Sequence, residues 1–337
     1  MTTVMLTGAT GFLGVHTTKA LLDAGHEVRA MVRTPARLQE HLRPLGLAGD
    51  GRVTAVEGDM TDEASVRAAV EGCDAVVHAA ATFSFRRRDT ARMKRDNAVG
   101  TRTVLGAGAD AGCPRLVHVS STVALARPGG VVVDHTSPLG TGPGPYSASK
   151  VASEQVAREM QAAGAPVTIV NPGSVLGPHD PYLGENNRYV RLILRGLLPA
   201  WPRGTAPYVD VRDVAAVLSA AVAHEPGGRY LVPGHDVPLP HAELRRVTGR
   251  RLPAAVVPPW AAGAASVPGD LTGWSWLPDG VEGTKIVGFA NTVDSSRTTD
   301  DLGVTARPFA ETLRDTIRWL AESGHITRRQ AGRALVG

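Results

Sequence analysis

Residues 6–14 read Leu6-Thr7-Gly8-Ala9-Thr10-Gly11-Phe12-Leu13-Gly14 and continue a short apolar run, Val4-Met5-Leu6. That run is typical of a buried strand. Residues 12–24 carry apolar side chains at positions typical of a helix, and Gly25 stands where such a helix would end. The sequence therefore predicts a strand, a glycine-rich turn and a helix in direct succession.

The three glycines of this turn have G-x-x-G-x-x-G spacing. Gly8 can adopt backbone angles that a side chain forbids, Gly11 lets the backbone come close to a ligand, and Gly14 lets the helix lie tightly against the sheet. The helix N-terminus offers free N–H groups and a partial positive charge to a pyrophosphate. A glycine pattern alone fits an ordinary turn equally well, but the flanking strand and helix supply the context of a dinucleotide site.

Length and charge narrow the class of protein. The 337 residues suffice for one large domain, or for one domain with a smaller companion. The formal net charge is +4, and the basic residues are scattered along the chain. The longest basic run, Arg86-Arg87-Arg88, is shorter than a nucleic-acid site requires and is typical of a solvated loop. We therefore expect no nucleic-acid partner.

Targeting and redox features indicate a cytoplasmic protein. The first strand begins close to the N-terminus, which leaves no room for a signal peptide, and no apolar run approaches membrane-spanning length. The two cysteines, Cys73 and Cys113, lack the spacing of a metal or redox site and fit buried thiols in a reducing compartment. We expect no membrane partner and no metal.

Strand-like and helix-like segments alternate over the first half of the chain. The expected strands after the first cover residues 26–32, 52–56, 74–78, 116–119 and 167–170. The expected helices between them cover residues 61–70, 90–111 and 146–163. This alternation predicts an α/β fold with a doubly wound parallel sheet and helices on both faces.

The alternation falters after Asn171, where Pro172-Gly173 interrupts the pattern. The later expected elements are helices over 189–198, 214–224 and 310–322 and a strand over 230–232, and residues 234–292 look irregular. We expect two lobes. Residues 1–172 and 206–233 would bind the dinucleotide, and residues 173–205 and 234–337 would form a smaller, discontinuous substrate lobe over the carboxyl edge of the sheet.

Tyr146 and Lys150 are four residues apart, so on a helix they share one face. A free tyrosine keeps its proton until about pH 10. A nearby ammonium favours the phenolate and lowers that pKa, which would suit proton exchange with a carbonyl/alcohol pair. The spacing alone is common by chance. Ser120-Ser121-Thr122 follows the strand over 116–119, and a hydroxyl there can either orient a substrate oxygen or cap backbone groups of the loop.

Several further motifs stand in a fixed order along the chain. They are Thr7-Gly8-x-x-Gly11-x-x-Gly14, Gly58-Asp59-Met60, His78-Ala79-Ala80-Ala81, Asn97 with Gly100-Thr101, Ser120-Ser121-Thr122, Tyr146-x-x-x-Lys150, and Asn171-Pro172-Gly173-Ser174-Val175-Leu176-Gly177-Pro178. Together they resemble the extended short-chain dehydrogenases/reductases of the NAD-dependent epimerase/dehydratase superfamily, whose fold is of Rossmann type. Residues 79–85 and the closing Leu302-Gly303-Val304 and Arg307-Pro308-Phe309 are similar to the dihydroflavonol 4-reductase-like branch.

The resemblance implies the catalytic residues. Tyr146 would be the general acid/base, Lys150 would bind the nicotinamide ribose and tune Tyr146, and Asn97 would help to hold the active site. Thr122 matches the usual catalytic Ser/Thr, with Ser121 as its nearest rival. His78, by contrast, is expected to be a packed residue at a strand end rather than a base.

The resemblance also implies the cofactor contacts. Asp59 and Met60 would meet the adenine, Ala79 and Ala80 would line the path of the pyrophosphate and ribose, and Pro172 and Val175 would flank the nicotinamide. The full expected set is Gly8, Thr10, Gly11, Phe12, Leu13, Gly14, Arg33, Arg37, Asp59, Met60, Ala79, Ala80, Ala81, Ser120, Tyr146, Lys150, Pro172, Gly173 and Val175.

The end of the second strand bears on the choice between NADP(H) and NAD(H). Folds that select NAD place a carboxylate here to hold the ribose 2′-hydroxyl. This chain instead has Arg33, with Arg37 a turn further on. A guanidinium forms charge-assisted hydrogen bonds to a 2′-phosphate, so we expect NADP(H) to be preferred, with NAD(H) as the alternative and two solvated loop arginines as the plainer interpretation.

The predicted function is hydride transfer between nicotinamide and a small carbonyl or alcohol substrate. One alternative is a nucleotide-sugar epimerase or dehydratase with tightly bound NAD, to which Asn187, Arg188 and Arg191 could contribute a diphosphate site. Another is a non-catalytic protein that binds NADP. The segments expected to shape the substrate pocket are residues 126–145 and 234–292.

The aromatic residues Phe83, Phe85, Trp274 and Trp276 suggest an apolar ligand, although core aromatics are the plainer interpretation. The substrate, the direction of the reaction and a homodimer through the helices that hold Asn97 and Tyr146 are left open.

Overall fold

The computed structural model describes residues 2–83, 89–272 and 280–335, and for residues 268–272 it describes the backbone alone. Arg86-Arg87-Arg88, Phe85, Trp274 and Trp276 lie outside the described residues, so the expectations placed on them are not addressed. Within the described ranges, every helix is too short or too polar to cross a bilayer.

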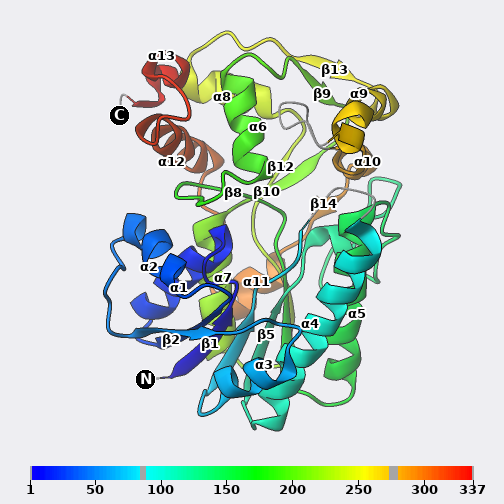
Figure 1. The fold of residues 1–337 in the computed structure, drawn as a ribbon. Helices are drawn as coiled ribbons and strands as arrows, with labels where there is room; N and C mark the ends of the chain where they lie inside the picture. Colours follow the sequence, from blue (N-terminus) through cyan, green and yellow to red (C-terminus); the bar gives the residue numbers. More distant parts are fainter. Residues whose placement is uncertain (1, 84–88, 273–279, 336–337) are drawn as a thin grey trace.

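A seven-stranded parallel sheet organises the first lobe, in the order β11-β7-β5-β4-β1-β2-β3 (Figure 1). The register runs Val4 to Val28 between β1 and β2, and Val4 to Ala75 between β1 and β4. The strand bounds are β1 (Thr3–Thr7), β2 (Glu27–Val32), β3 (Val53–Glu57), β4 (Ala75–His78), β5 (Arg115–Val119), β7 (Val167–Asn171) and β11 (Arg229–Leu231). The strand order reverses between β1 and β4, and ligands of open α/β sheets bind at such a point.

Helices cover both faces of this sheet, as the alternating pattern predicts. One face packs against α1 (Phe12–Asp23), α2 (Ala36–Leu42) and α7 (Val211–Ala223). The other face packs against α3 (Glu63–Val70), α4 (Thr90–Asp110) and α5 (Pro145–Ala162). The expected α/β class is therefore confirmed.

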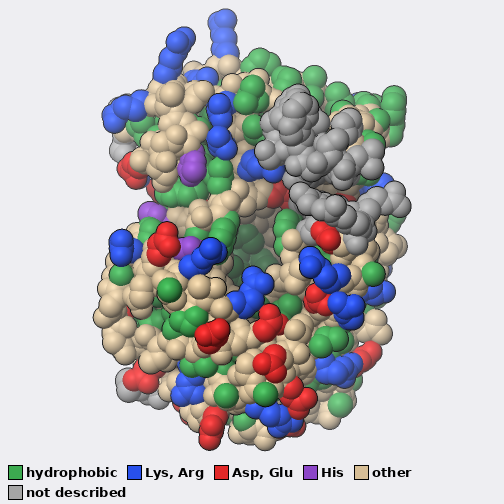
Figure 2. Space-filling model, viewed as in Figure 1, with side chains coloured by type: hydrophobic (Ala, Val, Ile, Leu, Met, Phe, Trp, Pro, Cys, Tyr) green, Lys and Arg blue, Asp and Glu red, His purple; other side chains and the backbone are tan. Residues whose placement is uncertain are grey.

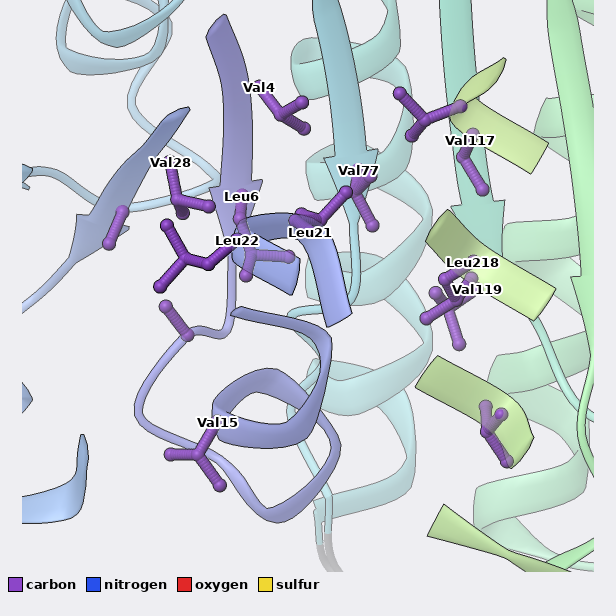
Figure 3. Packing of buried hydrophobic residues seen from close by; sticks show 14 of the residues in the cluster. Val4, Leu6, Val15, Leu21, Leu22, Val28, Val77, Val117, Val119 and Leu218 are labelled. Atoms are coloured by element: carbon purple, nitrogen blue, oxygen red, sulfur yellow. The ribbon is translucent and has the colours of Figure 1, made fainter. Parts of the chain in front are cut away.

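The core of the first lobe follows from the two-residue period of the strands. In β1, Val4 and Leu6 point toward α1 and α7, whereas Met5 points to the opposite core. Figure 3 shows the first of these cores, in which Leu21 and Leu22 of α1 meet strand residues such as Val28. The inner strands are buried on both faces, which is why they read as nearly continuous apolar runs, whereas the edge strand β3 is largely exposed.

The second lobe lies over the carboxyl edge of the sheet (Figure 1). A three-stranded sheet, a two-stranded sheet and several helices build it around a separate core of buried residues. Its elements are β8 (Ser174–Leu176), α6 (Glu185–Leu194), β9 (Ala200–Pro202), β10 (Ala206–Asp210), β12 (His235–Val237), α8 (Pro240–Thr248), β13 (Ala255–Val257), α9 (Pro259–Thr272), α10 (Val281–Phe289), α12 (Phe309–Glu322) and α13 (Arg328–Ala331).

Two features of the C-terminal half depart from the sequence-based expectation. Residues 234–292, expected to be irregular, contain α8, α9 and α10. The helix α11 (Ser296–Leu302) packs against α7 and β11, and Thr298 Oγ1 donates to the carbonyl of Leu231 at 2.6 Å. This part of the range 234–337 therefore lies on the first lobe. The chain crosses between the lobes more often than the predicted boundaries imply.

Candidate active site

The glycine-rich turn forms a cradle whose backbone conformation and close contacts require glycine. Gly8 has φ +75°, and a Cβ built on it would lie 2.9 Å from the backbone nitrogen of Ala80. A Cβ on Gly14 would lie 2.0 Å from the carbonyl oxygen of Gly8. Gly11, which precedes α1, provides no side-chain cap, so the first N–H groups of the helix remain available. These residues fit the pyrophosphate of a dinucleotide.

Thr7 holds the next segment of this cradle. Its Oγ1 accepts hydrogen bonds from the backbone N–H groups of Ala79 (3.1 Å) and Ala80 (3.0 Å) and lies 2.9 Å from Nδ1 of His78. Burial lowers the pKa of His78 to about 3, and the charge of Lys150 acts in the same direction. His78 is therefore neutral and packed at the strand end.

The expected adenine and ribose contacts gather at the ends of β2 and β3. Arg33, just after β2, and Arg37, in the first turn of α2, are both exposed. The Asp59 carboxylate accepts hydrogen bonds from Oγ1 and the backbone N–H of Thr61, which lower its pKa, and the charge of Arg33 lowers it further. Met60 lies against Gly100 of α4, where a Cβ would come within 2.8 Å of its side chain.

Two further members of the expected cofactor set lie at the surface of this lobe. The carbonyl oxygen of Thr10 is 2.7 Å from Nδ1 of His41. Ala81 is exposed just beyond β4.

Asn97 ties the loop after β4 to the helix that carries Tyr146. Its Oδ1 accepts from the backbone N–H of Thr82 at 2.7 Å, and its Nδ2 donates to the carbonyl of Thr82 and to Oγ of Ser149. The side chain is buried. Asn97 therefore fixes two walls of the site relative to each other.

Tyr146 stands near the start of α5 and faces the substrate cavity. Burial raises the pKa of its phenol, a hydrogen bond with the Ser121 side chain opposes that rise, and the charges of Glu185 and Glu282 add to it. The net shift is upward, opposite to the lowering predicted from the Tyr–Lys spacing, and Lys150 is not among the groups that shift this pKa. The ring of Phe83 packs edge-on against the phenol, with centroids 4.9 Å apart.

The structure pairs Tyr146 with Ser121, the rival of Thr122. Ser121 Oγ also lies 3.3 Å from the carbonyl oxygen of Pro172, which accepts the backbone N–H of Thr122 at 2.9 Å. Both Ser121 and Thr122 line the cavity. Pro172 thus holds the loop that presents the two hydroxyls.

Lys150 is buried one turn further along α5, and its Nζ donates to the carbonyl of Val119 at 3.3 Å. Burial lowers its pKa to about 8, opposed by the charge of Glu154. The ammonium is therefore charged below that pH and is lost as the pH rises through it. Asn97, Ser121, Tyr146 and Lys150 all lie at the carboxyl ends of β4 and β5 or on the helices that follow them.

A buried carboxylate behind the site escaped the sequence analysis. Glu154 accepts hydrogen bonds from Ser120 Oγ, from Asn171 Nδ2 and from the guanidinium of Arg158. The Ser120 hydroxyl is therefore engaged in the interior, and its backbone N–H donates to the carbonyl of Val170 at 2.8 Å. The spacing of four residues from Lys150 to Glu154 and again to Arg158 was the signal that could have found this cluster.

A cavity of about 750 Å³ lies between the carboxyl edge of the sheet and the second lobe. Figure 2 shows hydrophobic side chains gathered in the hollow between the lobes. The wall nearest the sheet includes Phe12, Leu13, Gly173 and Val175, all from the expected cofactor set. A Cβ on Gly173 would lie 2.3 Å from the carbonyl oxygen of Pro207, so this wall approaches β10 closely.

The charges around the cavity are acidic. Among the lining residues that the structure describes, Asp180 and Glu185 carry charge, and none is a lysine or arginine. Of the three residues considered for a diphosphate site, Asn187 lines the cavity and donates to Asp180, whereas Arg188 and Arg191 are not in its described wall. Of the three residues that could contribute to a diphosphate site under the epimerase alternative, only Asn187 therefore lies in the described wall of this cavity.

The loop over residues 126–145 is held by the far end of the chain. Its short strand β6 (Val132–Val133) pairs in parallel with β14 (Thr292–Val293). Asn291 accepts from the backbone N–H of Arg127 at 3.0 Å and donates to its carbonyl at 2.8 Å. The sequence carried no local signal for this pairing, because the two segments are more than 150 residues apart.

Comparisons with known proteins agree with this geometry. Residues 4–232 match the model of the NAD dependent epimerase/dehydratase family. The chain is 29% identical to "Putative dihydroflavonol 4-reductase" of Synechocystis sp. over 95% of both chains. It is 31% identical to "Cinnamoyl-CoA reductase 1" of Oryza sativa subsp. japonica, over 96% of this chain and 91% of the relative.

A solved structure shows the same fold. It is UDP-glucose 4-epimerase from Bifidobacterium longum in complex with NAD+ and UDP, with a TM-score of 0.74 and 20% identity over 96% of this chain and 99% of that one. The glycine cradle, the order of the motifs and the family match lead to one conclusion. The chain belongs to the NAD-dependent epimerase/dehydratase family of extended short-chain dehydrogenases/reductases, which bind a nicotinamide cofactor, and it is an oxidoreductase acting on CH–OH or carbonyl groups.

Proposed function

We propose that the protein is an NADPH-dependent reductase that converts a bulky, apolar carbonyl compound to its alcohol. The observation that carries this proposal is the cavity of about 750 Å³, which has Tyr146 and Ser121 on one wall and mainly apolar residues elsewhere. A site of this size and character suits a largely apolar ligand fixed by a few polar groups. Two of the relatives are named as reductases.

Each polar residue of the site has a proposed task. Tyr146 holds the proton that its Oη passes to the substrate oxygen, and Ser121 donates a hydrogen bond that orients that oxygen, with Thr122 beside it. Lys150 binds the nicotinamide ribose, and Asn97 positions the loop and helix around it. The nicotinamide, when bound, supplies the hydride. The protein orients the reactants and excludes water from the cavity.

The raised pKa of Tyr146 favours reduction as the working direction. A phenol buried beside Glu185 and Glu282 keeps its proton at neutral pH and above. Carbonyl reduction needs that protonated form, whereas alcohol oxidation needs the phenolate. We therefore expect the Tyr146 proton to stay in place as the pH rises to 9, so that a loss of reduction above about pH 8 reflects the Lys150 ammonium, with oxidation slow at neutral pH.

The epimerase alternative requires a site for a nucleotide diphosphate. Such a ligand carries at least two negative charges, and the described wall of the cavity presents Asp180 and Glu185 rather than a cation. The negative charges of these two carboxylates would repel the negatively charged diphosphate. This argues against a sugar nucleotide in the cavity.

Net redox turnover distinguishes these two functions. We expect NADPH absorbance to fall with aldehydes, ketones or sterol ketones as substrates, and we expect dialysis to yield protein free of cofactor. The control is the same panel with UDP- and dTDP-sugars. Cofactor that survives dialysis, together with sugar isomerisation and no net absorbance change, would contradict the proposal.

Lys150→Ala tests the proposed ribose contact. We expect turnover to fall and cofactor affinity to weaken about tenfold, the contribution of one charge-assisted hydrogen bond. The wild-type affinity should also weaken as the pH rises through about 8, because the ammonium is lost there, and the variant should lack this dependence. Fluorescence titration of NADPH across pH measures both effects. An unchanged affinity with an unchanged pH profile would remove the assignment.

A further inference from the structure

The helix that carries Tyr146 begins without a cap of its own. Gly144 is its N-cap residue and Pro145 its first helical residue, and neither has a side chain that can accept a backbone N–H. Ser147 Oγ satisfies the N–H of Gly144 at 3.1 Å, but the N–H groups of Tyr146 and Ser147 point out of the helix end. Such orphan donors need an acceptor when they are buried.

Glu282 supplies that acceptor from a distant part of the chain. Its Oε2 accepts the backbone N–H of Tyr146 at 3.0 Å, and its Oε1 accepts that of Ser147 at 2.6 Å. The Glu282 side chain is buried, with 5% of its surface exposed. A carboxylate at a helix N-terminus interacts favourably with the helix dipole and forms charge-assisted hydrogen bonds.

The glycine at the N-cap makes room for this carboxylate. A Cβ on Gly144 would lie 2.4 Å from Cδ and 2.5 Å from Oε2 of Glu282. The φ of Gly144 is −153°, so its backbone is open to any residue. The absence of a side chain at Gly144 is thus explained by the carboxylate and not by the backbone.

Glu282 belongs to a helix that lines the cavity. It lies in the first turn of α10, and Gly283, Thr284 and Val287 of the same helix line the cavity. One helix of the second lobe therefore contacts both the substrate space and the backbone of the proton donor. If α10 is displaced, the start of α5 loses two hydrogen bonds.

We propose that Glu282 is a positioning residue for Tyr146: it anchors the first turn of α5 so that the phenol meets the substrate oxygen beside Ser121, and it links the seating of α10 over the substrate to proton transfer. This inference rests on the proposed reductase function. Glu282 itself touches neither cofactor nor substrate in this scheme.

The charges around Tyr146 distinguish a positioning role of Glu282 from a purely structural one. The groups that act on the phenol are Glu282 of α10, Glu185 of α6 and the hydroxyl of Ser121 after β5, while Lys150 lies one turn along α5 itself. The charge of Glu282 raises the pKa of Tyr146. Removing that charge should therefore lower this pKa, which a purely structural residue would not do.

Glu282→Gln removes the charge and one of the two acceptors. We expect turnover in carbonyl reduction to fall about tenfold with the NADPH affinity unchanged, because a displaced phenol loses its near-attack geometry. In the oxidation of the product alcohol, the rise of rate with pH should move to lower pH. Steady-state kinetics across pH in both directions measure these effects.

Gly144→Ala disturbs the same contact without altering Glu282. The added methyl group should push the carboxylate away from the helix end, so turnover should fall as in Glu282→Gln. The two changes break one interaction, and the double variant should therefore be no worse than either single variant. Glu311→Gln is the matched control, because it removes an exposed carboxylate from the first turn of α12 and should leave kinetics unchanged.

Amide hydrogen exchange supplies a readout independent of activity. In both variants, the peptide that contains Tyr146 and Ser147 should exchange faster than in the wild type, whereas Glu311→Gln should not alter it. Four outcomes would each overturn the inference. They are wild-type exchange in this peptide, a wild-type pH profile, additive effects of the two changes, and loss of fold in both variants. A wild-type enzyme without carbonyl reductase activity would instead overturn the proposed function, even where exchange reveals the cap.

Discussion

Tyr146→Phe should lower turnover in carbonyl reduction by about 10²–10⁴-fold, the usual contribution of a positioned proton donor. The substitution removes the hydroxyl that bonds with Ser121 but keeps the ring that packs against Phe83. The fold and the cofactor affinity should therefore remain close to those of the wild type. Steady-state turnover on the substrate found by the panel, together with NADPH titration, measures both quantities.

The matched control is Tyr230→Phe. Tyr230 is also buried, and its hydroxyl donates to Asp301 at 3.2 Å in the first lobe, away from the cavity wall. We expect that variant to lose about 1 kcal/mol of stability, the contribution of one hydrogen bond, with turnover unchanged. Near-normal turnover in Tyr146→Phe would show that another group delivers the proton.

The fold of the first lobe was predictable because its signals are local. Most of its strands are buried on both faces and read as apolar runs, although the edge strand β3 is largely exposed. Most of its helices carry local signals, whereas the short α2 (Ala36–Leu42) was not expected. The strand expected over 26–32 is Glu27–Val32 in the structure, and the helix expected over 90–111 is Thr90–Asp110. Gly8 and Gly14 could be identified as necessary glycines because the turn they form lies within one short segment.

The second lobe was less predictable because only some of its helices carry a local signal. The helices α12 and α6 carry a strong period and overlap the helices expected over 310–322 and 189–198, whereas α9 and α10 carry only a weak one. The helix α9 (Pro259–Thr272) contains Pro268 and two glycines, which argue against a helix in isolation. Tertiary packing overrides that weak propensity.

In the candidate site, too, the residues with local sequence signals could be predicted and those that act on distant segments could not. Tyr146 and Lys150 could be named from four-residue spacing, and Asn97 from the ordered motifs. Glu282 and Asn291 could not, because each acts on a backbone more than 130 residues away and belongs to no motif. The pKa of Tyr146 likewise depends on burial by the second lobe, so the spacing with Lys150 predicted the wrong direction.

Arg33→Asp should weaken NADPH binding by one to two orders of magnitude and leave NADH binding nearly unchanged. Arg33 is exposed at the end of β2, and its charge acts on Asp59 at the end of β3, where the ribose of a dinucleotide bound in the glycine cradle would lie. Charge-assisted hydrogen bonds from a guanidinium to the 2′-phosphate contribute about 1.5–3 kcal/mol, which corresponds to that change in affinity. The new carboxylate would add repulsion from the 2′-phosphate.

Titration of NADPH and NADH into both proteins at one fixed salt concentration tests this, because exposed charges are screened by salt. The matched control is Arg329→Asp, which makes the same charge change on α13 of the second lobe and should leave both affinities as in the wild type. The wild type should itself prefer NADPH by one to two orders of magnitude. Equal wild-type affinities, or a variant that loses both cofactors alike, would assign Arg33 to the solvated surface and contradict the preference for NADPH.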